Sequence, residues 1–314
     1  MNLNPSTAHH TTGRVAVAIP CLNEELTVAK VVRDFHAALP HADVYVVDNG
    51  SSDGSVEMAR SAGAVVIREK RPGKGYVMQS IFSRVDADYY IIVDGDDTYA
   101  AGGAERLLAP LIADEADMVV GSRLSTYSQG SFRSLHVFGN RLLTWLVNRV
   151  FHTRITDMMS GYRAVTRRVA KSIPILSSGF EVETELTLRI LDRGYVIREV
   201  PLPYRERPRG SLSKLRTFRD GFRVVRSILN IARTYRPLTF FGAIGSIFFI
   251  GGLAAGIPVV VEYIRILYVT HVPLAILATG CMILSFFSVS VGIVLSTVGE
   301  QIKAVIELQL LNRD

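Results

Sequence analysis

Two long apolar segments near the C-terminus constrain this chain more than any other feature of its sequence. The segments 237–261 and 272–299 contain no Asp, Glu, Lys, Arg or His. Each exceeds the roughly 20 apolar residues that a helix needs to cross a bilayer. Because of these segments, the mean hydropathy of the whole chain is positive, at +0.26. The sequence therefore predicts two transmembrane helices and excludes a simple soluble globule.

A strongly basic stretch directly precedes the first apolar segment. Residues 205–236 contain ten Lys or Arg against two acidic residues, although the net charge of the chain is only +6. The remainder is slightly acidic, so nucleic-acid binding is a poor interpretation. Lys and Arg beside a span are typical of the cytoplasmic side, where anionic lipid head groups attract them. The only Asp, Glu, Lys, Arg or His residues between the spans are Glu262, Arg265 and His271, so we expect both long ends in the cytoplasm.

The same patterns divide the chain into segments. Residues 1–13 have no early apolar run, so we expect a disordered N-terminus without a signal peptide. Apolar residues recur every three or four positions over 214–236, which predicts a basic amphipathic helix at the membrane interface, or alternatively a helix packed on the soluble domain. The remaining expected segments are a soluble domain over 14–213, spans over 237–261 and 272–299, and a cytoplasmic helix or tail over 300–314.

The soluble domain alternates short β-branched runs with helical patterns. This alternation is typical of a parallel sheet with crossover helices. We expect strands over 15–19, 44–48, 65–67, 89–94 and 118–121, and helices over 26–39, 55–62, 75–85 and 103–112. Ligands of such sheets bind beyond the carboxyl ends of the strands. Polar residues gather there after the first, second and fourth expected strands.

The most specific local pattern is VDGDD, after the fourth expected strand. Asp94 and Asp96, two residues apart, can hold Mg²⁺ or Mn²⁺, which prefer oxygen ligands and commonly bridge phosphate oxygens. A turn that is rich in Asp because Asp caps helices is the alternative. DGDDT also satisfies a haloacid dehalogenase-type phosphatase pattern, in which the first Asp attacks phosphorus. Those enzymes usually carry the pattern on their first strand.

A second polar turn, DNGSSDGS, follows the second expected strand. Asp48 could accept hydrogen bonds from a nucleobase and Asp53 could fix a ribose, although a plain loop has the same composition. Neither G-x-G-x-x-G nor G-x-x-x-x-G-K-[ST] occurs, which disfavours dinucleotide enzymes and P-loop phosphotransferases. The phosphates of a nucleotide would instead need a metal ion and cationic side chains.

Seven motifs and the terminal pair of spans together resemble one known family. In order, the motifs are IPCLNEE, VVDNGSSDGS, VDGDD, VGSR, DMMSGYRA, FEVETEL and EVPLPYRERPRGSLSK. They resemble the family 2 glycosyltransferases that charge a polyprenyl phosphate with a sugar, such as dolichyl-phosphate mannose synthases and bacterial undecaprenyl-phosphate glucosyltransferases. The resemblance runs from Val15 to the C-terminus. It implies an α/β fold of the GT-A type, Rossmann-like and nucleotide-sugar-binding, with metal-dependent inverting transfer to a lipid phosphate at the membrane surface.

The resemblance also implies roles for individual residues. The residues expected to bind the nucleotide sugar are Pro20, Asn23, Glu24, Asp48, Asp53, Lys74 and Asp94, of which Asp94 shares the metal with Asp96. The residues expected at the acceptor phosphate are Arg123, Ser160, Arg207 and Lys214, and those expected to be catalytic are Asp96, Asp157 and Arg163. Whether Asp97 ligates the metal is left open. Arg163 and Arg207 could instead be surface ion-pair partners, and Glu181, Glu183 and Glu185 fit the acidic start of a helix without a catalytic role.

The sequence thus predicts transfer from a nucleotide sugar, with UDP favoured over GDP-mannose because PRGSLSK leans toward the bacterial branch. A phosphate dianion needs no strong general base, so Asp157 is expected to orient an arginine or the acceptor. Two spans make a poor pore for a processive polysaccharide synthase, and a scaffold without turnover is the non-enzymatic alternative. We expect a bacterial plasma-membrane protein that self-associates through small residues of the first span, namely Gly242, Gly245, Gly251, Gly252 and Gly256.

Overall fold

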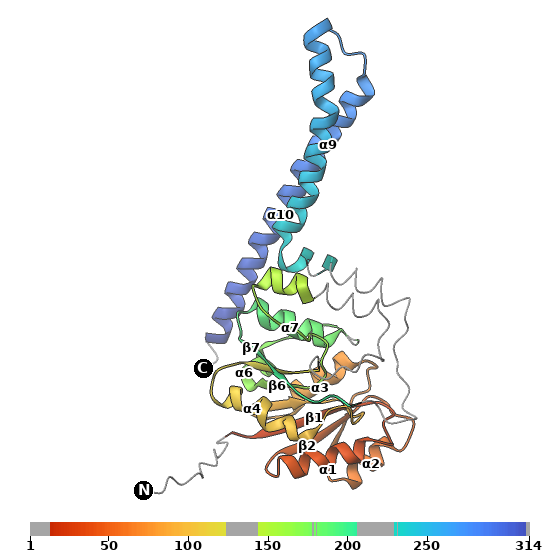
Figure 1. Ribbon diagram of the computed structural model, residues 1–314, viewed down its shortest axis with the longest axis vertical. Coiled ribbons are helices and arrows are strands. Elements are labelled where there is room, and N and C mark those ends of the chain that lie inside the picture. Colours follow the sequence, from red (N-terminus) through yellow and green to blue (C-terminus); the bar gives the residue numbers. More distant parts are fainter. Residues whose placement is uncertain are drawn as a thin grey trace. The chain divides into compact units, whose positions relative to one another are not determined.

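The computed structural model describes residues 13–123, 144–177, 179, 181–205, 229–230 and 232–311. The chain forms two compact units, Met1–Arg216 and Thr217–Asp314 (Figure 1). The expected N-terminal segment 1–13 lies almost wholly outside the described residues, as does most of the expected amphipathic helix. Of that helix, residues 229–230 and 232–236 are described, and all of these except Arg236 are helical.

A seven-stranded sheet forms the centre of the first unit, with the strand order β3-β2-β1-β4-β6-β5-β7. The strands are β1 (Val15–Cys21), β2 (Asp43–Asp48), β3 (Val65–Arg68), β4 (Tyr89–Ile92), β5 (Met118–Ser122), β6 (Arg163–Thr166) and β7 (Ile197–Pro201). The five strands expected from the sequence are all present, and each begins and ends within two residues of its expected bounds.

The expected parallel sheet is interrupted by β6, a strand that was not predicted from the sequence. This strand runs antiparallel to both of its neighbours, β4 and β5, whereas the other pairs in the sheet are parallel. Arg163, the first residue of β6, lies opposite Ile92, the last residue of β4. Because β6 runs in the opposite direction to β4 and β5, it begins at the edge of the sheet where those two strands end. The loop before β6 is therefore brought to the ligand-binding edge of the sheet.

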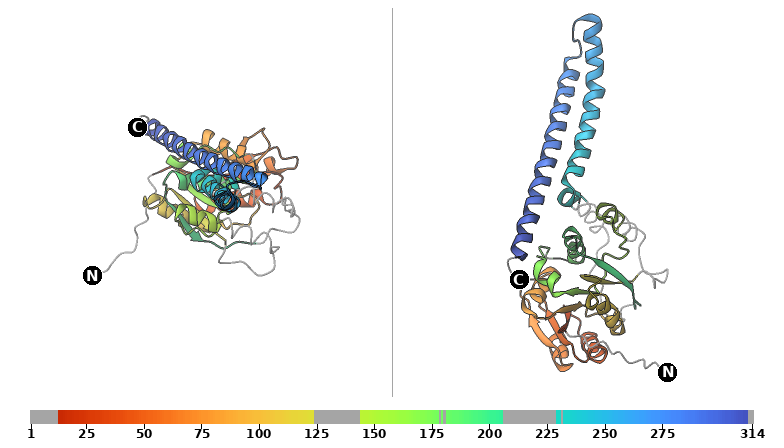
Figure 2. Two further views of the ribbon diagram at one scale, coloured as in Figure 1. Left: turned by 90° about the horizontal axis from the view of Figure 1, so that it is seen from above. Right: turned by 90° about the vertical axis from the view of Figure 1, so that its left-hand side faces the viewer.

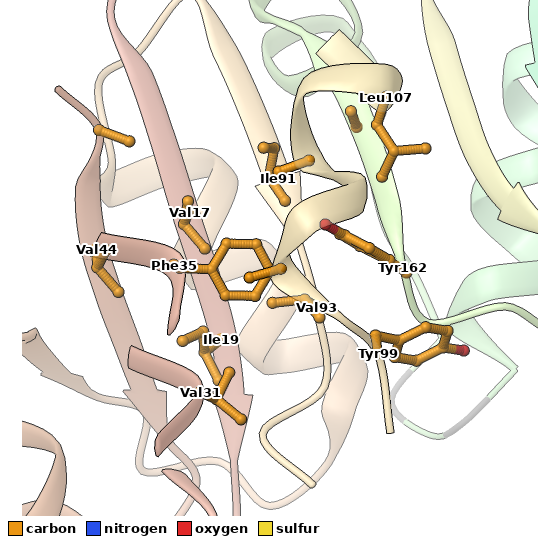
Figure 3. Packing of buried hydrophobic residues seen from close by; sticks show 14 of the residues in the cluster. Val17, Ile19, Val31, Phe35, Val44, Ile91, Val93, Tyr99, Leu107 and Tyr162 are labelled. Carbon is orange, nitrogen blue, oxygen red and sulfur yellow. The ribbon is translucent and has the colours of Figure 1, made fainter. Parts of the chain in front are cut away.

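Helices cover both faces of this sheet. They are α1 (Val28–Ala38), α2 (Ser55–Ser61), α3 (Lys74–Arg84), the 3₁₀ turn η1 (Ala101–Gly103), α4 (Ala104–Ile112), α6 (Arg167–Ser172) and α7 (Val182–Asp192). Side chains alternate along β1, so Val17 and Ile19 enter one core and Ala16 and Ala18 the other. Figure 3 shows the first core, where Phe35 of α1 packs beside the strands. Burial on both faces explains why the strands read as nearly continuous apolar runs.

The second unit contains two long helices, α9 (Pro237–Ile266) and α10 (Val272–Leu311). Both views in Figure 2 show them side by side. The segments Pro237–Ile266 and Val272–Ile302 are candidate membrane spans, each with a mean hydropathy of 2.2. Only 22% and 11% of their most apolar windows are buried. Apolar side chains left outside a core are what lipid-facing helices require.

Small residues set the packing between these two helices. A Cβ atom on Gly245 would lie 2.8 Å from Val289 Cγ2, and one on Gly252 would lie 3.0 Å from Met282 Sδ. Gly242 and Gly251, by contrast, have nothing within 4 Å of that position. Gly245 and Gly252 therefore serve contacts within the hairpin, whereas the sequence analysis had assigned them to self-association.

Replacing Gly252 by Leu is expected to destabilise the hairpin, lowering its thermal midpoint by about 5 °C. The new Cβ would also lie 3.3 Å from the backbone oxygen of Ala278, which cannot move aside without displacing α10. Overpacking of this kind costs about 1–3 kcal/mol, and each kcal/mol shifts the midpoint of a chain of this size by roughly 2–4 °C. The measurement is the fraction of full-length protein that stays monodisperse in detergent on heating. Gly251→Leu is the matched control, and equal loss in both variants would contradict the assigned packing.

Candidate active site

The loops after β1 and β2 are tied together at the carboxyl edge of the sheet. Asn23 donates its backbone N–H to Ser51 Oγ (2.9 Å), and its side-chain oxygen accepts the N–H of Ser52 (2.8 Å). Glu24 donates its N–H to Ser55 Oγ (2.8 Å). Pro20, also expected at the nucleotide, pairs with Val47 near the end of β1. The structure thus brings Pro20, Asn23 and Glu24 to the turn 48–55.

The two aspartates of that turn bind their own backbone. The carboxylate of Asp48 is buried and accepts the N–H groups of Gly50 (3.3 Å) and Ser51 (3.0 Å). Asp53 accepts from Ser55 and from the N–H of Glu25. Burial raises the pKa of Asp53, but these hydrogen bonds outweigh it and lower the pKa overall. Both side chains therefore shape the turn, and the expected contacts to a base and a ribose stay predictions.

Asn49 connects this turn to the loop before α3, a link that the sequence analysis missed. Its amide donates to the backbone oxygens of Glu69 (3.3 Å) and Arg71 (2.7 Å), and its oxygen accepts the N–H of Gly73 (2.7 Å). Glu69 is itself buried, and hydrogen bonds from Arg71 and Ser80 lower its pKa to about 2. An ionised buried carboxylate with fixed partners holds the loop rigidly. The start of α3, at Lys74, is thereby fixed in position.

Lys74 lies between two carboxylates. Its Nζ is 2.6 Å from Asp94 Oδ1 and 2.5 Å from Glu183 Oε1. Burial would lower the pKa of Lys74, but the charges of Asp94 and Glu183 raise it above the ordinary lysine value. From its position in the sequence, Glu183 was expected only to fit the acidic start of a helix. The available signal was its place beside Val182 and Leu186 on the buried side of α7, because a buried acid requires a partner.

The other two aspartates of VDGDD have separate surroundings. Asp96 is buried, and its Oδ1 accepts the Oγ1–H (2.6 Å) and the N–H (3.2 Å) of Thr98. Asp97 has a left-handed backbone conformation, with φ of 57°, and its Oδ1 lies 2.8 Å from Lys30 Nζ on α1. Asp94 is partly exposed and contacts Lys74, Asp96 is buried against Thr98, and the carboxylate of Asp97 is bound to Lys30.

The carboxylate pair fits a divalent cation that shares its coordination with a substrate. In the described part of the chain, no group of three or more His, Cys, Asp or Glu is arranged to hold a metal by itself. Mg²⁺ in proteins is commonly bound through one or two carboxylates, with phosphate oxygens and water completing its shell. Asp94 and Asp96 supply oxygen donors of this kind. They suit Mg²⁺ or Mn²⁺ together with a diphosphate.

The loop before β6 sits directly against Asp94. A Cβ atom on Gly161 would lie 2.1 Å from Asp94 Oδ2. The N–H of Gly161 donates to the hydroxyl of Tyr99 (3.0 Å), and Ser160 Oγ donates to the oxygen of Gly121 (2.6 Å). Ser160, expected at the acceptor phosphate, is fully buried, so here it fixes the loop. The role of Tyr99 was not predicted from the sequence.

The buried side chain of Arg163 anchors this loop through hydrogen bonds to its backbone. It is only 1% exposed, and its guanidinium donates to the backbone oxygens of Ser160 (2.8 Å), Met158 (2.5 Å) and Glu183 (2.9 Å). Burial lowers its pKa. The surface ion pair considered for Arg163 is therefore wrong. Its expected catalytic role stays a prediction, and its contacts with protein carbonyls make it a positioning residue for the loop.

Asp157 and Arg123 form a two-point ion pair. Arg123 donates Nε to Asp157 Oδ2 (2.7 Å) and Nη2 to Asp157 Oδ1 (2.9 Å). Burial raises the pKa of Asp157, but the hydrogen bonds and charge of Arg123 outweigh it and lower the pKa overall. Glu199 of β7, also unforeseen, accepts the N–H groups of Thr156 and Asp157. The guanidinium of Arg123 also lies 5.6 Å from the ring centre of Tyr204. Asp157 thus orients Arg123. Arg207 and Lys214, expected at the acceptor phosphate, lie outside the described residues.

Comparison with known proteins gives one family and a consistent set of relatives. Residues 16–173 match the family described as glycosyl transferase family 2. Glycosyltransferase AglJ of Haloferax volcanii is 32% identical over 300 residues, which cover 94% of this chain and 98% of that protein. The dolichyl-phosphate hexose transferase of the same organism is 32% identical over 218 residues, 69% of this chain and 93% of that protein. Polyprenol monophosphomannose synthase of Mycolicibacterium smegmatis is 30% identical over 217 residues, 63% of this chain and 80% of that protein.

Solved structures share the fold of the first unit. Glucosyl-3-phosphoglycerate synthase from Mycobacterium tuberculosis, in complex with Mn²⁺, UDP-glucose and phosphoglyceric acid, aligns with a TM-score of 0.59. The alignment covers 71% of this chain and 80% of that chain, at 23% sequence identity. The GT-A architecture expected from the motifs is therefore confirmed.

Proposed function

The chain belongs to glycosyl transferase family 2, and from this premise we propose that it transfers a sugar from a nucleotide sugar to a polyprenyl phosphate, with inversion at the anomeric carbon. Relatives named for dolichyl-phosphate and polyprenol-phosphate sugar transfer support the acceptor class. The observation that carries the proposal is that Asp94 and Asp96 lie at the same sheet edge as two oriented cations, Lys74 and Arg123. The phosphatase alternative loses its basis, because DGDDT follows β4 in a glycosyltransferase fold.

The reaction is a single displacement. An oxygen of the acceptor phosphate forms a bond to the anomeric carbon, and the bond from that carbon to the diphosphate oxygen breaks. The electron pair leaves with the nucleoside diphosphate. The second pKa of a phosphate monoester is about 6, so the acceptor is mostly dianionic at neutral pH and needs no general base. The ionised, arginine-bound state of Asp157 agrees with an orienting role.

Each cationic group has a distinct task in this scheme. Lys74, which lies between Asp94 and Glu183, places positive charge where the diphosphate would lie. Arg123, held in one orientation by Asp157, offers the planar fork of donors that suits a phosphate. A divalent cation on Asp94 and Asp96 would supply Lewis-acid stabilisation of the departing diphosphate. A protein of the same fold crystallised with Mn²⁺ and UDP-glucose supports this use of a metal.

We further propose a UDP-sugar as donor, with GDP-mannose as the alternative, and the cytoplasmic membrane face as the place of reaction. The two candidate spans would anchor the catalytic unit, and the basic residues before them favour contact with anionic lipid. Both features serve an acceptor whose phosphate stands at the membrane surface.

The test is a turnover assay with full-length protein in lipid, polyprenyl phosphate, Mg²⁺ or Mn²⁺, and a panel of radiolabelled UDP- and GDP-sugars. We expect label from one donor to enter the lipid phase, and we expect both a chelator and Asp96→Asn to abolish it. Arg198→Gln is a matched control, because Arg198 forms an ion pair with Glu115 in which both side chains are half-exposed. Donor hydrolysis without lipid labelling would contradict the proposal that polyprenyl phosphate is the acceptor. Absence of turnover with every donor would favour the alternative of a scaffold without catalytic activity.

A further inference from the structure

The ammonium group of Lys74 lies between two carboxylates that come from different parts of the fold. Asp94 comes from the end of β4 and belongs to the pair that fits a divalent cation, whereas Glu183 comes from the first turn of α7. The side chains of Lys74, Asp94 and Glu183 are 12%, 28% and 10% exposed. The two ion pairs are therefore largely shielded from water and weakly screened by salt.

Glu183 is held in place independently of Lys74. Its backbone oxygen accepts from Arg163 Nη1 (2.9 Å) and from Thr187 Oγ1 (2.9 Å). The same guanidinium anchors the loop that carries Gly161, which in turn lies against Asp94. The backbone of Glu183 is thus fixed beside the site and keeps its carboxylate within reach of Lys74, whose ammonium sits on a flexible four-carbon stem.

Two cations cannot share one carboxylate oxygen at close range without repulsion. A divalent ion that ligates Asp94 would meet the ammonium of Lys74, which lies 2.6 Å from Oδ1. Lys74 therefore competes with the ion as long as it stays on Asp94. A second anion within reach lowers the cost of its departure, and Glu183, at 2.5 Å, is that anion.

We propose that Lys74 is an exchangeable counter-ion of Asp94, and that Glu183 is the positioning residue that retains the ammonium when a divalent cation takes its place. The inference rests on the proposed function for the metal and the diphosphate. It adds that the Lys74–Glu183 pair sets how tightly the metal binds and leaves Lys74 directed toward the departing diphosphate.

Manganese binding by the full-length protein in detergent, without donor or acceptor, tests this inference. The probe is Mn²⁺ alone, followed by the loss of the free-ion signal in electron paramagnetic resonance. Partners of metal-ligating groups change metal affinity by about 10–100-fold, so we expect Lys74→Met to tighten binding by about tenfold and Glu183→Gln to weaken it by about tenfold. In the double variant, Glu183→Gln should have no further effect, because the competing ammonium is absent.

Glu185→Gln is the matched control. Glu185 lies on the same helix turn but binds the N–H groups of Leu176 and Ser177 and the side chain of Arg189, away from Lys74. It should leave Mn²⁺ affinity unchanged. The inference is overturned if Lys74→Met binds no more tightly than the wild type, or if Glu183→Gln weakens binding equally with and without Lys74. Lipid labelling by the wild type tests the proposed function separately, since it does not depend on these affinities.

Discussion

Gly161→Ala is expected to reduce sugar transfer by about 100-fold, because displacing a reacting group by about 1 Å can cost that much in rate. The added methyl group would lie 2.1 Å from Asp94 Oδ2 and 2.8 Å from its Cγ. Gly161 is not among the described glycines with positive φ, so alanine strains no backbone angle there and the effect is steric. Asp94 must rotate away from the loop, which disturbs its contact with Lys74 and moves its carboxylate from the proposed metal site.

The measurement compares the steady-state rate of lipid labelling with the thermal midpoint of the same preparation. Gly102→Ala is the control, because a Cβ atom at Gly102 meets nothing within 4 Å. We expect Gly102→Ala to behave as the wild type, and Gly161→Ala to keep a midpoint within a few degrees of it. Full activity of Gly161→Ala would show that the carboxylate of Asp94 can move without consequence, and would remove it from the proposed site.

Asp157→Asn is expected to lower kcat/KM by about 100-fold, the order of loss seen when an orienting contact or a donor to developing charge is removed. In this variant an amide nitrogen replaces one carboxylate oxygen of Asp157. An amide nitrogen cannot accept a hydrogen bond, so one of the two hydrogen bonds donated by Arg123 would be lost. The guanidinium would then lose its fixed orientation. Combined with Arg123→Gln, the loss should not increase further, because the two side chains act as one unit.

The pH profile separates orientation from base catalysis. The pKa of Asp157 is lowered in the folded protein, so its carboxylate is ionised throughout the range near neutrality. We expect activity to fall as pH drops below about 6, where the acceptor phosphate takes up a proton and loses its dianionic form. The pH at which this fall occurs should be the same in Asp157→Asn as in the wild type. A fall that disappears in Asp157→Asn would identify Asp157 as a titrating base and contradict the assignment.

The features that sequence predicted well are those fixed by local pattern. The strand that ends at Asp48 and the strand that leads into Asp94 follow from short apolar runs that end in polar turns, and their expected bounds hold within two residues. The two apolar helices follow from length and composition alone. Because parallel strands end at one edge, the gathering of Asn23, Asp48 and Asp94 at that edge was also predictable.

The features that sequence missed depend on contacts between distant parts of the chain. The reversed direction of β6 follows from its pairing with β4 and β5, and no periodicity within four residues encodes a partner. The contact of Lys74 with Glu183 joins the starts of two helices that are remote in sequence. Arg163 was expected to be catalytic, whereas its burial against the loop before β6 depends on the packing of α7 and β6. The sequence thus indicated at which edge of the sheet the candidate site lies, whereas tertiary packing determines which side chains line that site.

The central claim is that the sugar is joined to the phosphate of a polyprenyl lipid, and mass spectrometry of that lipid tests it most directly. After incubation with the active donor, we predict that polyprenyl phosphate gains the mass of one sugar residue in step with nucleoside diphosphate release. The Asp96→Asn variant should leave the lipid unchanged. Nucleoside diphosphate release with an unmodified lipid, or with the sugar attached to another molecule, would contradict the account.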